Sequence, residues 1–115
     1  MKLVDLEPTF VGRYSDGPPV TYQELGSNAD GAQGLLFICP KCGNHSVLCW
    51  FNNPRNAPKV PDAAFPRPGR WTWNGGTFDV LTLTPSVDLS KIDTDNPAGP
   101  DRCYWHGNVT NGETT

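Results

Sequence analysis

Short stretches of alternating hydrophobic and polar residues run through the chain and predict strands rather than helices. Gly34 to Ile38 is a short continuous apolar run, which is typical of a buried strand, and Ser46 to Phe51 alternates behind it. Arg70 to Asn74 also alternates, with two tryptophans on one face, and Phe78 to Thr84 is rich in β-forming residues. We expect the first two segments to pair as one hairpin and the last two as another.

The two ends of the chain carry weaker patterns. Leu3 to Tyr14 is interrupted by Pro8 and predicts one edge strand or two short ones. Thr21-Tyr22-Gln23-Glu24 fits a capping box with Gly26 as a stop, which predicts a single helical turn. Asn111-Gly112 lies between two short arms and predicts a hairpin turn.

Two irregular stretches separate the expected strands. Residues 52–69 contain Pro54, Pro58, Pro61, Pro66 and Pro68, and no helix survives that spacing. We interpret this stretch as a proline-rich excursion that Ala63-Ala64-Phe65 pins to the core. The segment from Asp88 to Arg102 reads as a polar loop.

Composition narrows the fold class further. The chain has 115 residues, with 12 glycines, 12 prolines and only 18% charged residues, which favours short strands and turns over long helices. We therefore predict a single domain spanning 1–115 that is mostly β, with long irregular loops and at most one short helical turn. The net charge of −3 argues against a general polyanion binder. No membrane or export segment is visible, so we expect a cytoplasmic protein.

The cysteines supply the candidate chemistry. Cys39-Pro40-Lys41-Cys42-Gly43 is a C-x-x-C-G turn, and Cys103-Tyr104-Trp105-His106-Gly107 is a C-x-x-H-G turn. Zinc prefers four sulfur or nitrogen ligands at tetrahedral corners, and each turn can present two of them. We predict one structural Cys3His zinc site formed by Cys39, Cys42, Cys103 and His106, in a zinc-stabilised β-sheet domain.

The fourth ligand is the open part of that prediction. Residues three apart face opposite sides of a flat strand, so Cys103 and His106 share a metal only if the chain bends there. His45 and Cys49 are the alternatives, although Cys49 also fits a small core residue. Metal-free thiols, a secreted disulfide framework and a redox disulfide are the remaining interpretations; the last needs a thioredoxin-like setting that the strand after Cys42 does not match.

Several landmarks follow one another along most of the chain: Thr9-Phe10-Val11, Cys39-Pro40-Lys41-Cys42-Gly43, Arg70-Trp71-Thr72-Trp73-Asn74-Gly75, Leu81-Thr82-Leu83-Thr84-Pro85-Ser86-Val87, and Cys103-Tyr104-Trp105-His106-Gly107. In this order they are similar to the DUF6527 family, small proteins of phage, prophage and mobile-element neighbourhoods. The resemblance implies metal binding, and some members sit beside ubiquitin-like conjugation genes. It implies no established activity.

These observations favour a small zinc-binding accessory protein of phage or mobile-element type, in the host cytoplasm if phage-encoded, that binds an unidentified protein partner. The alternative is a nucleic-acid-binding module of zinc-ribbon type, with a stacking patch made of Arg67, Arg70, Arg102, Trp71, Trp73 and Trp105. A zinc-dependent hydrolase is disfavoured because a Cys3His site leaves no open metal position. We assign no catalytic or cofactor-binding residue and leave the oligomeric state open.

Overall fold

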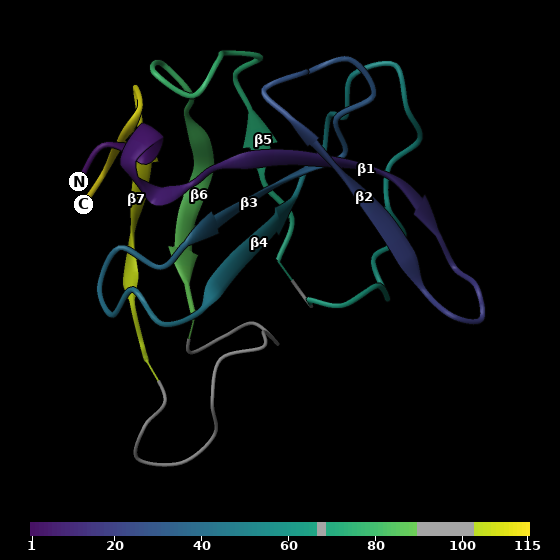
Figure 1. Ribbon diagram of the computed structural model, residues 1–115, viewed down its shortest axis with the longest axis horizontal. Helices are drawn as coiled ribbons and strands as arrows, with labels where there is room; N and C mark the ends of the chain where they lie inside the picture. Colours follow the sequence, from purple (N-terminus) through teal and green to yellow (C-terminus); the bar gives the residue numbers. More distant parts are fainter. Residues whose placement is uncertain (67–68, 90–102) are drawn as a thin grey trace.

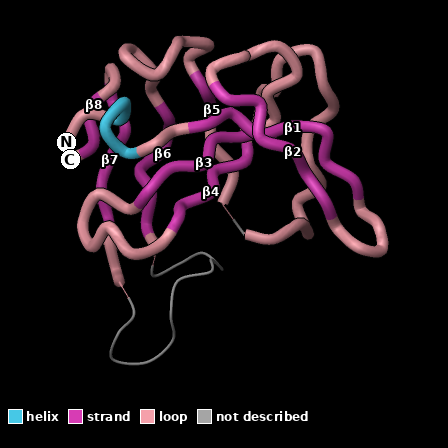
Figure 2. The backbone as a smooth tube through the Cα atoms, in the orientation of Figure 1, coloured by secondary structure: helices cyan, strands magenta, loops and turns pink. Residues whose placement is uncertain are grey.

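Two four-stranded antiparallel sheets form the framework of the protein in the computed structural model, which describes residues 1–66, 69–89 and 103–115 (Figures 1 and 2). The first sheet has the strand order β2-β1-β3-β4 and the second has the order β5-β6-β7-β8. The elements, in chain order, are the 3-10 turn η1 (Leu3–Leu6), β1 (Thr9–Ser15), β2 (Thr21–Gly26), β3 (Gly34–Ile38), β4 (Ser46–Trp50), β5 (Thr72–Trp73), β6 (Leu83–Asp88), β7 (His106–Thr110) and β8 (Glu113–Thr114).

Both sheets contribute side chains to one hydrophobic core. Alternate residues of β4 point inward, where Val47 and Cys49 are fully buried, and β6 contributes Val87 in the same way. The rings of Phe51 and Trp73 stack at 4.8 Å between their centroids. Burying each such side chain contributes about 1.5–3 kcal/mol, so this core holds the two sheets together.

The sheets are also joined along one side of the molecule. Phe51, directly after β4, forms a parallel bridge with Trp71, directly before β5. The Trp71 N–H donates to the Trp50 carbonyl at 3.0 Å, and the Asn52 N–H donates to the Trp71 carbonyl at 2.7 Å. These backbone bonds therefore join the end of β4 in the first sheet to the start of β5 in the second.

The predicted fold class is confirmed: the protein is mostly β, with one 3-10 turn in the described part of the chain. The β3–β4 hairpin has the predicted bounds to within one residue, with Leu36 opposite Leu48. The β7–β8 hairpin turns at Asn111 and Gly112, which adopt φ angles of 49° and 77°. No described helix is of the length and apolarity that crossing a bilayer requires.

Three predicted elements were wrong. Thr21–Gly26 is strand β2 rather than a helical turn, because its pairing with β1 outweighs the local capping signal. β1 lies inside its sheet between β2 and β3, and is not an edge strand. The strand expected at Phe78–Thr84 begins only at Leu83, because residues 77–80 form a turn closed by a 3.0 Å hydrogen bond from the Val80 N–H to the Thr77 carbonyl.

The described part of the proline-rich stretch, residues 52–66, has no helix or strand and packs on the rest of the protein. Ala64 is buried against the outer side of the first sheet, whereas Ala63 and Phe65, which the sequence also expected to pin this stretch to the core, are exposed. The Arg70 guanidinium organises the turn beside it by donating hydrogen bonds to four backbone carbonyls, those of Pro61, Ala64, Pro66 and Gly69. Burial lowers the pKa of Arg70, although Asp62 opposes this effect.

Candidate functional site: a metal-ligand group and a Ser-His-Asp array

Three cysteines and a histidine from distant parts of the chain meet at the tip of the β3–β4 hairpin. The ligand atoms of Cys39, Cys42, His45 and Cys103 all lie within 4.8 Å of one another. Cys39 Sγ is 3.6 Å from Cys103 Sγ, and Cys42 Sγ is 3.2 Å from His45 Nδ1. A tetrahedral zinc with bonds of about 2.3 Å to sulfur holds its sulfurs about 3.8 Å apart. The spacing of this group is therefore compatible with zinc binding.

A tight backbone turn presents the hairpin ligands. The Gly43 N–H donates to the Cys39 carbonyl at 3.0 Å, and Gly43 has a φ of 69°, which glycine adopts without strain. The Asn44 N–H donates to Cys42 Sγ at 3.5 Å. Burial raises the pKa of the Cys39 thiol to about 11. Burial acts in the same direction on Cys42, but hydrogen bonds, chiefly from the Asn44 backbone, lower its pKa overall.

The structure brings together three of the four predicted ligands. Cys39, Cys42 and Cys103 lie in the group with His45, which the sequence left as an alternative, whereas His106 lies on β7 outside it. Cys49 lies apart from the group in the core, fully buried, and burial raises the pKa of its thiol.

A serine, a histidine and an aspartate lie together on the outer face of the second sheet. Ser86 Oγ is 3.1 Å from His106 Nε2, within hydrogen-bond distance. On the other side of the ring, His106 Nδ1 is 4.0 Å from Asp88 Oδ2, and the two residues are opposite each other across β6 and β7. A hydroxyl, an imidazole and a carboxylate in this order allow the ring to take the hydroxyl proton while the carboxylate orients the ring.

Strand alternation accounts for the common direction of the two β6 residues. Val87 points into the core with 0% exposure, so its neighbours Ser86 and Asp88 point outward. The Ser86 backbone is held by Trp71, the residue directly before β5, whose indole N–H donates to the Ser86 carbonyl at 3.3 Å. The imidazole of His106 reaches them from β7 with 60% of its side chain exposed, against 19% for Asp88. The imidazole of the array is therefore accessible to solvent.

An irregularity in the β6–β7 pairing sets the surroundings of Ser86. Leu83 pairs with Val109 and Val87 pairs with Gly107, so residues 84–86 of β6 face Asn108 alone on β7. Asn108 is exposed and shares its face of β7 with His106. Its carbonyl accepts a hydrogen bond from the Thr115 N–H at 3.1 Å, on the side away from β6. A β-bulge at such a place re-aims side chains, and this one leaves Asn108 as the β7 residue opposite the part of β6 that contains Ser86.

Sequence reasoning missed the Ser-His-Asp array. One signal was available, since Ser86 and Asp88 two residues apart in a strand must share a face. The contact between Ser86 and His106 could not be predicted, because the two residues are 20 positions apart and His106 was interpreted as a metal ligand.

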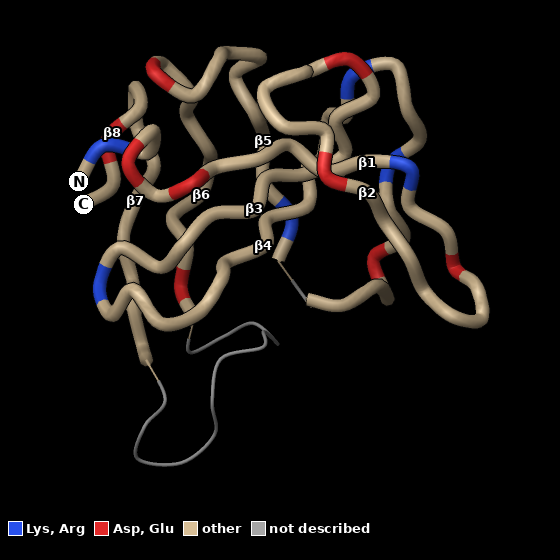
Figure 3. The backbone as a smooth tube through the Cα atoms, in the orientation of Figure 1, with Lys and Arg blue, Asp and Glu red and all other residues tan. Residues whose placement is uncertain are grey.

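The stacking patch that the sequence suggested for nucleic acid is not exposed, as far as its residues are described. Trp71, Trp73 and Trp105 are 3%, 2% and 6% exposed, and the Arg70 guanidinium is occupied by backbone carbonyls. Arg67 and Arg102 lie outside the described residues. Figure 3 shows the described basic and acidic residues scattered along the chain rather than gathered over one sheet.

These features define a small, mostly β protein that carries a Ser-His-Asp array of serine-hydrolase type beside a group compatible with a metal ion. A comparison with family models matches residues 18–115 to the family described as bacterial ubiquitination-like system serine protease (BubE). Because the match covers most of the chain, the protein belongs to this family. Comparisons with curated proteins and with solved structures gave no significant match.

The family match corrects the resemblance stated from the sequence. The chain matches the BubE family and not DUF6527. The landmarks that suggested DUF6527 are short, and several of them serve general purposes in this fold. Trp71 and Trp73 are core residues, and Asn111-Gly112 makes a hairpin turn, which many unrelated β proteins share.

Proposed function

We propose that this protein is a serine protease in which Ser86 is the nucleophile, His106 the general base and Asp88 the residue that orients His106. The observation that carries the proposal is the 3.1 Å contact between Ser86 Oγ and His106 Nε2. The description of the family to which the chain belongs supports the same reaction class. The 4.0 Å separation between His106 and Asp88 fits a free enzyme, in which catalytic hydrogen bonds are often long and tighten with substrate.

The proposed reaction uses each residue in turn. Ser86 Oγ attacks the carbonyl carbon of the scissile peptide bond while His106 Nε2 takes the hydroxyl proton. His106 then gives that proton to the leaving amine as the C–N bond breaks, and the acyl group remains on Ser86 as an ester. Water, deprotonated by His106, hydrolyses the ester and restores the serine. Asp88 stabilises the imidazolium that forms in both steps.

We further propose that the group at the hairpin tip binds one zinc ion with His45 as the fourth ligand. The three sulfurs and one imidazole nitrogen would fill a tetrahedral shell, which is typical of structural zinc. The ion would tie the β3–β4 hairpin to Cys103, three residues before His106. Its proposed role is therefore to hold the segment that leads into β7, and hydrolysis is assigned to Ser86.

A protease acts on a polypeptide, so a protein partner remains part of this proposal, now as the substrate. The family description names a bacterial ubiquitination-like system, and we propose that the substrate belongs to such a system. This replaces an accessory protein that acts by binding another protein as our preferred interpretation.

A fluorophosphonate reagent tests the proposed nucleophile, because it reacts covalently with activated serines. We expect stoichiometric labelling of the purified protein, mapped to Ser86 by mass spectrometry. Ser86→Ala should abolish labelling and His106→Ala should slow it by about a thousandfold or more. Ser27→Ala, at an exposed turn position, is the matched control and should label normally. Equal labelling of the Ser86→Ala variant, or labelling mapped to another residue, would contradict the proposal.

A further inference from the structure

The proposed nucleophile lies in a stretch of β6 that is not fixed by strand pairing. β5 pairs with β6 only at Leu83 and Thr84, so this pairing ends two residues before Ser86. On the other side, the pairing of β6 with β7 passes from Leu83 directly to Val87. Among the described residues, neither pairing includes Ser86, so its backbone lacks the repeated hydrogen bonds that normally fix a strand.

A tryptophan side chain supplies a hydrogen bond at this point. Trp71 lies directly before β5, and its indole N–H donates to the Ser86 carbonyl at 3.3 Å. The residue before Ser86 is Pro85, which has no backbone N–H to donate. The indole hydrogen bond therefore anchors the backbone of the serine whose Oγ lies 3.1 Å from His106 Nε2.

The donor is itself held firmly in place. The Trp71 backbone N–H donates to the Trp50 carbonyl at 3.0 Å, and the Asn52 N–H donates to the Trp71 carbonyl at 2.7 Å. The Trp71 ring is buried, and a Cβ at Gly69 would lie only 2.3 Å from its Cη2 atom. A ring enclosed in this way cannot turn without moving its neighbours. The end of the first sheet therefore fixes the indole N–H, and through it the Ser86 backbone.

We propose that Trp71 is a positioning residue of the active site, whose indole N–H holds the Ser86 backbone so that the serine Oγ stays within reach of His106 Nε2. The inference rests on the proposed function, since it needs Ser86 to be the nucleophile. A displacement of about 1 Å in a reacting group can lower a rate by about a hundredfold. Loss of this hydrogen bond should therefore slow the reaction of Ser86 in a protein that remains folded.

An isostere of tryptophan removes the donor and keeps the shape of the ring. Benzothienylalanine has a sulfur in place of the indole N–H, and chemical synthesis of the 115-residue chain can introduce it at one position. We expect Trp71→benzothienylalanine to react with a fluorophosphonate at Ser86 about tenfold or more slowly than the wild type. The maximal rate of labelling should fall while the probe concentration that gives half of it stays the same, because the buried ring does not contact the probe.

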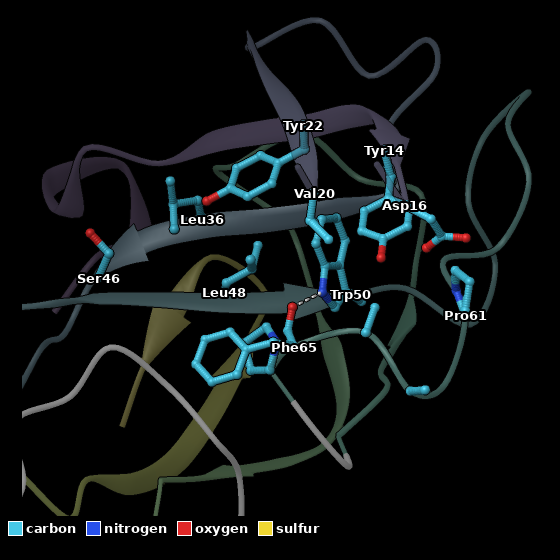
Figure 4. A pocket seen from close by; sticks show the side chains of 13 residues that line it. Tyr14, Asp16, Val20, Tyr22, Leu36, Ser46, Leu48, Trp50, Pro61 and Phe65 are labelled. Atoms are coloured by element: carbon cyan, nitrogen blue, oxygen red, sulfur yellow. Dashed lines mark hydrogen bonds between the residues drawn. The ribbon is translucent and has the colours of Figure 1, made fainter. Parts of the chain in front are cut away.

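Two other buried tryptophans provide matched controls. The Trp73 indole N–H donates to the Gly76 carbonyl at 3.0 Å. The Trp50 indole N–H donates to the Phe65 carbonyl at 3.0 Å, as Figure 4 shows. The same isostere at either position removes one buried hydrogen bond from an indole to a carbonyl, and neither bond involves Ser86. Both controls should label at the wild-type rate, and all three variants should unfold at similar urea concentrations.

Ordinary substitutions give a second comparison, in protein expressed in cells. Trp71→Phe and Trp73→Phe each remove one indole and leave a smaller ring in the core. Both should unfold at lower urea concentrations than the wild type, because each leaves a cavity. Only Trp71→Phe should slow the labelling of Ser86 by about tenfold or more. Near-UV circular dichroism at the labelling temperature checks that both variants are folded.

The outcomes separate this inference from the proposed function. Labelling of the wild type at Ser86, with slowing confined to the Trp71 variants, would support both. A Trp71 variant that reacts as fast as the wild type, or equal slowing in the Trp73 variant, would overturn the positioning role and leave the nucleophile in place. Absence of labelling at Ser86 in the wild type would overturn the proposed function, and the positioning role with it.

Discussion

Ser86 and Asp88 share one face of β6, and strand pairing brings His106 of β7 beside them. A buried Val87 turns its two neighbours outward, and the β6–β7 register places His106 opposite Asp88. The same register leaves Asn108 as the β7 residue that faces 84–86. The tetrahedral intermediate of the proposed reaction carries a negative oxygen beside Ser86, and a side-chain amide is a suitable donor for it.

Asn108→Ala should therefore lower kcat by about a hundredfold to a thousandfold with little change in KM, since the amide acts only on the developing charge. Steady-state kinetics on a cleaved peptide measure both constants. Asn108→Asp should be no better, because a carboxylate lacks the N–H donors. Thr110→Ala, at the next exposed position on the same face of β7, is the control and should retain activity. Unchanged kcat in Asn108→Ala would exclude this role.

The sequence named Cys39, Cys42 and Cys103 as ligands together with His106, and gave His45 and Cys49 as alternatives to His106. The structure brings the three cysteines together with His45. Cys39 and Cys42 are tied by a local turn whose spacing is visible in the sequence, and Cys103 was expected to join them. The choice between His45 and His106 depends on which side of β7 faces the hairpin. That direction is set by the pairing of β6 with β7, which no local pattern encodes.

His45 lies at the tip of the β3–β4 hairpin and His106 lies on β7, so we expect the two histidines to have different functions. His45→Ala should reduce the zinc content from about one equivalent per chain to well below it, as measured by elemental analysis. His106→Ala should keep the zinc and lose fluorophosphonate labelling, because its imidazole contacts Ser86 instead. Loss of zinc in His106→Ala with full retention in His45→Ala would reverse the assignment.

The β7–β8 turn depends on glycine for two reasons at once. Gly112 has a φ of 77°, and a Cβ there would lie 2.2 Å from the Asp79 carbonyl oxygen. Gly112→Ala should lower the free energy of unfolding by about 2–4 kcal/mol, measured by urea denaturation. Gly26→Ala is the matched control, with a φ of 62° but nothing within 4 Å of its Cβ, and should cost about 1–2 kcal/mol. Equal losses in the two variants would mean that the close approach to Asp79 is relieved at no cost.

Elements with strong periodic patterns were predictable and those defined by distant pairing were not. β3 and β4 have apolar runs flanked by turn residues, and both were found from the sequence. Most residues of β2 are exposed, so the strand has no alternating apolar pattern. The local capping-box sequence therefore led to the prediction of a helical turn. Its strand conformation comes from pairing with β1, with Val11 opposite Glu24.

For the molecule as a whole, the proposed metal ion would act as a clamp between the two sheets. Its ligands close a loop of about 60 residues, and loop-closure entropy gives such a clamp about 4 kcal/mol. A strong chelator should lower the free energy of unfolding by up to this amount in urea titrations. Cys39→Ser should be destabilised and insensitive to chelator, whereas Cys49→Ala should lose packing energy and still respond. An unchanged free energy of unfolding of the wild-type protein in the presence of the chelator would contradict a structural metal.

The division of the strands between the sheets has a consequence for the order of folding. The first sheet is built from residues 9–50 and the second from residues 72–114, so each comes from one continuous half of the chain. During synthesis, the first half can pair its strands and present Cys39, Cys42 and His45 to a metal before any residue of the Ser-His-Asp array has been made. Cys103 then docks onto a hairpin already in place, and His106 follows three residues later. A newly made chain would thus acquire its nucleophile–base pair only after its metal ligands were complete, so proteolytic activity would appear at the last stage of folding.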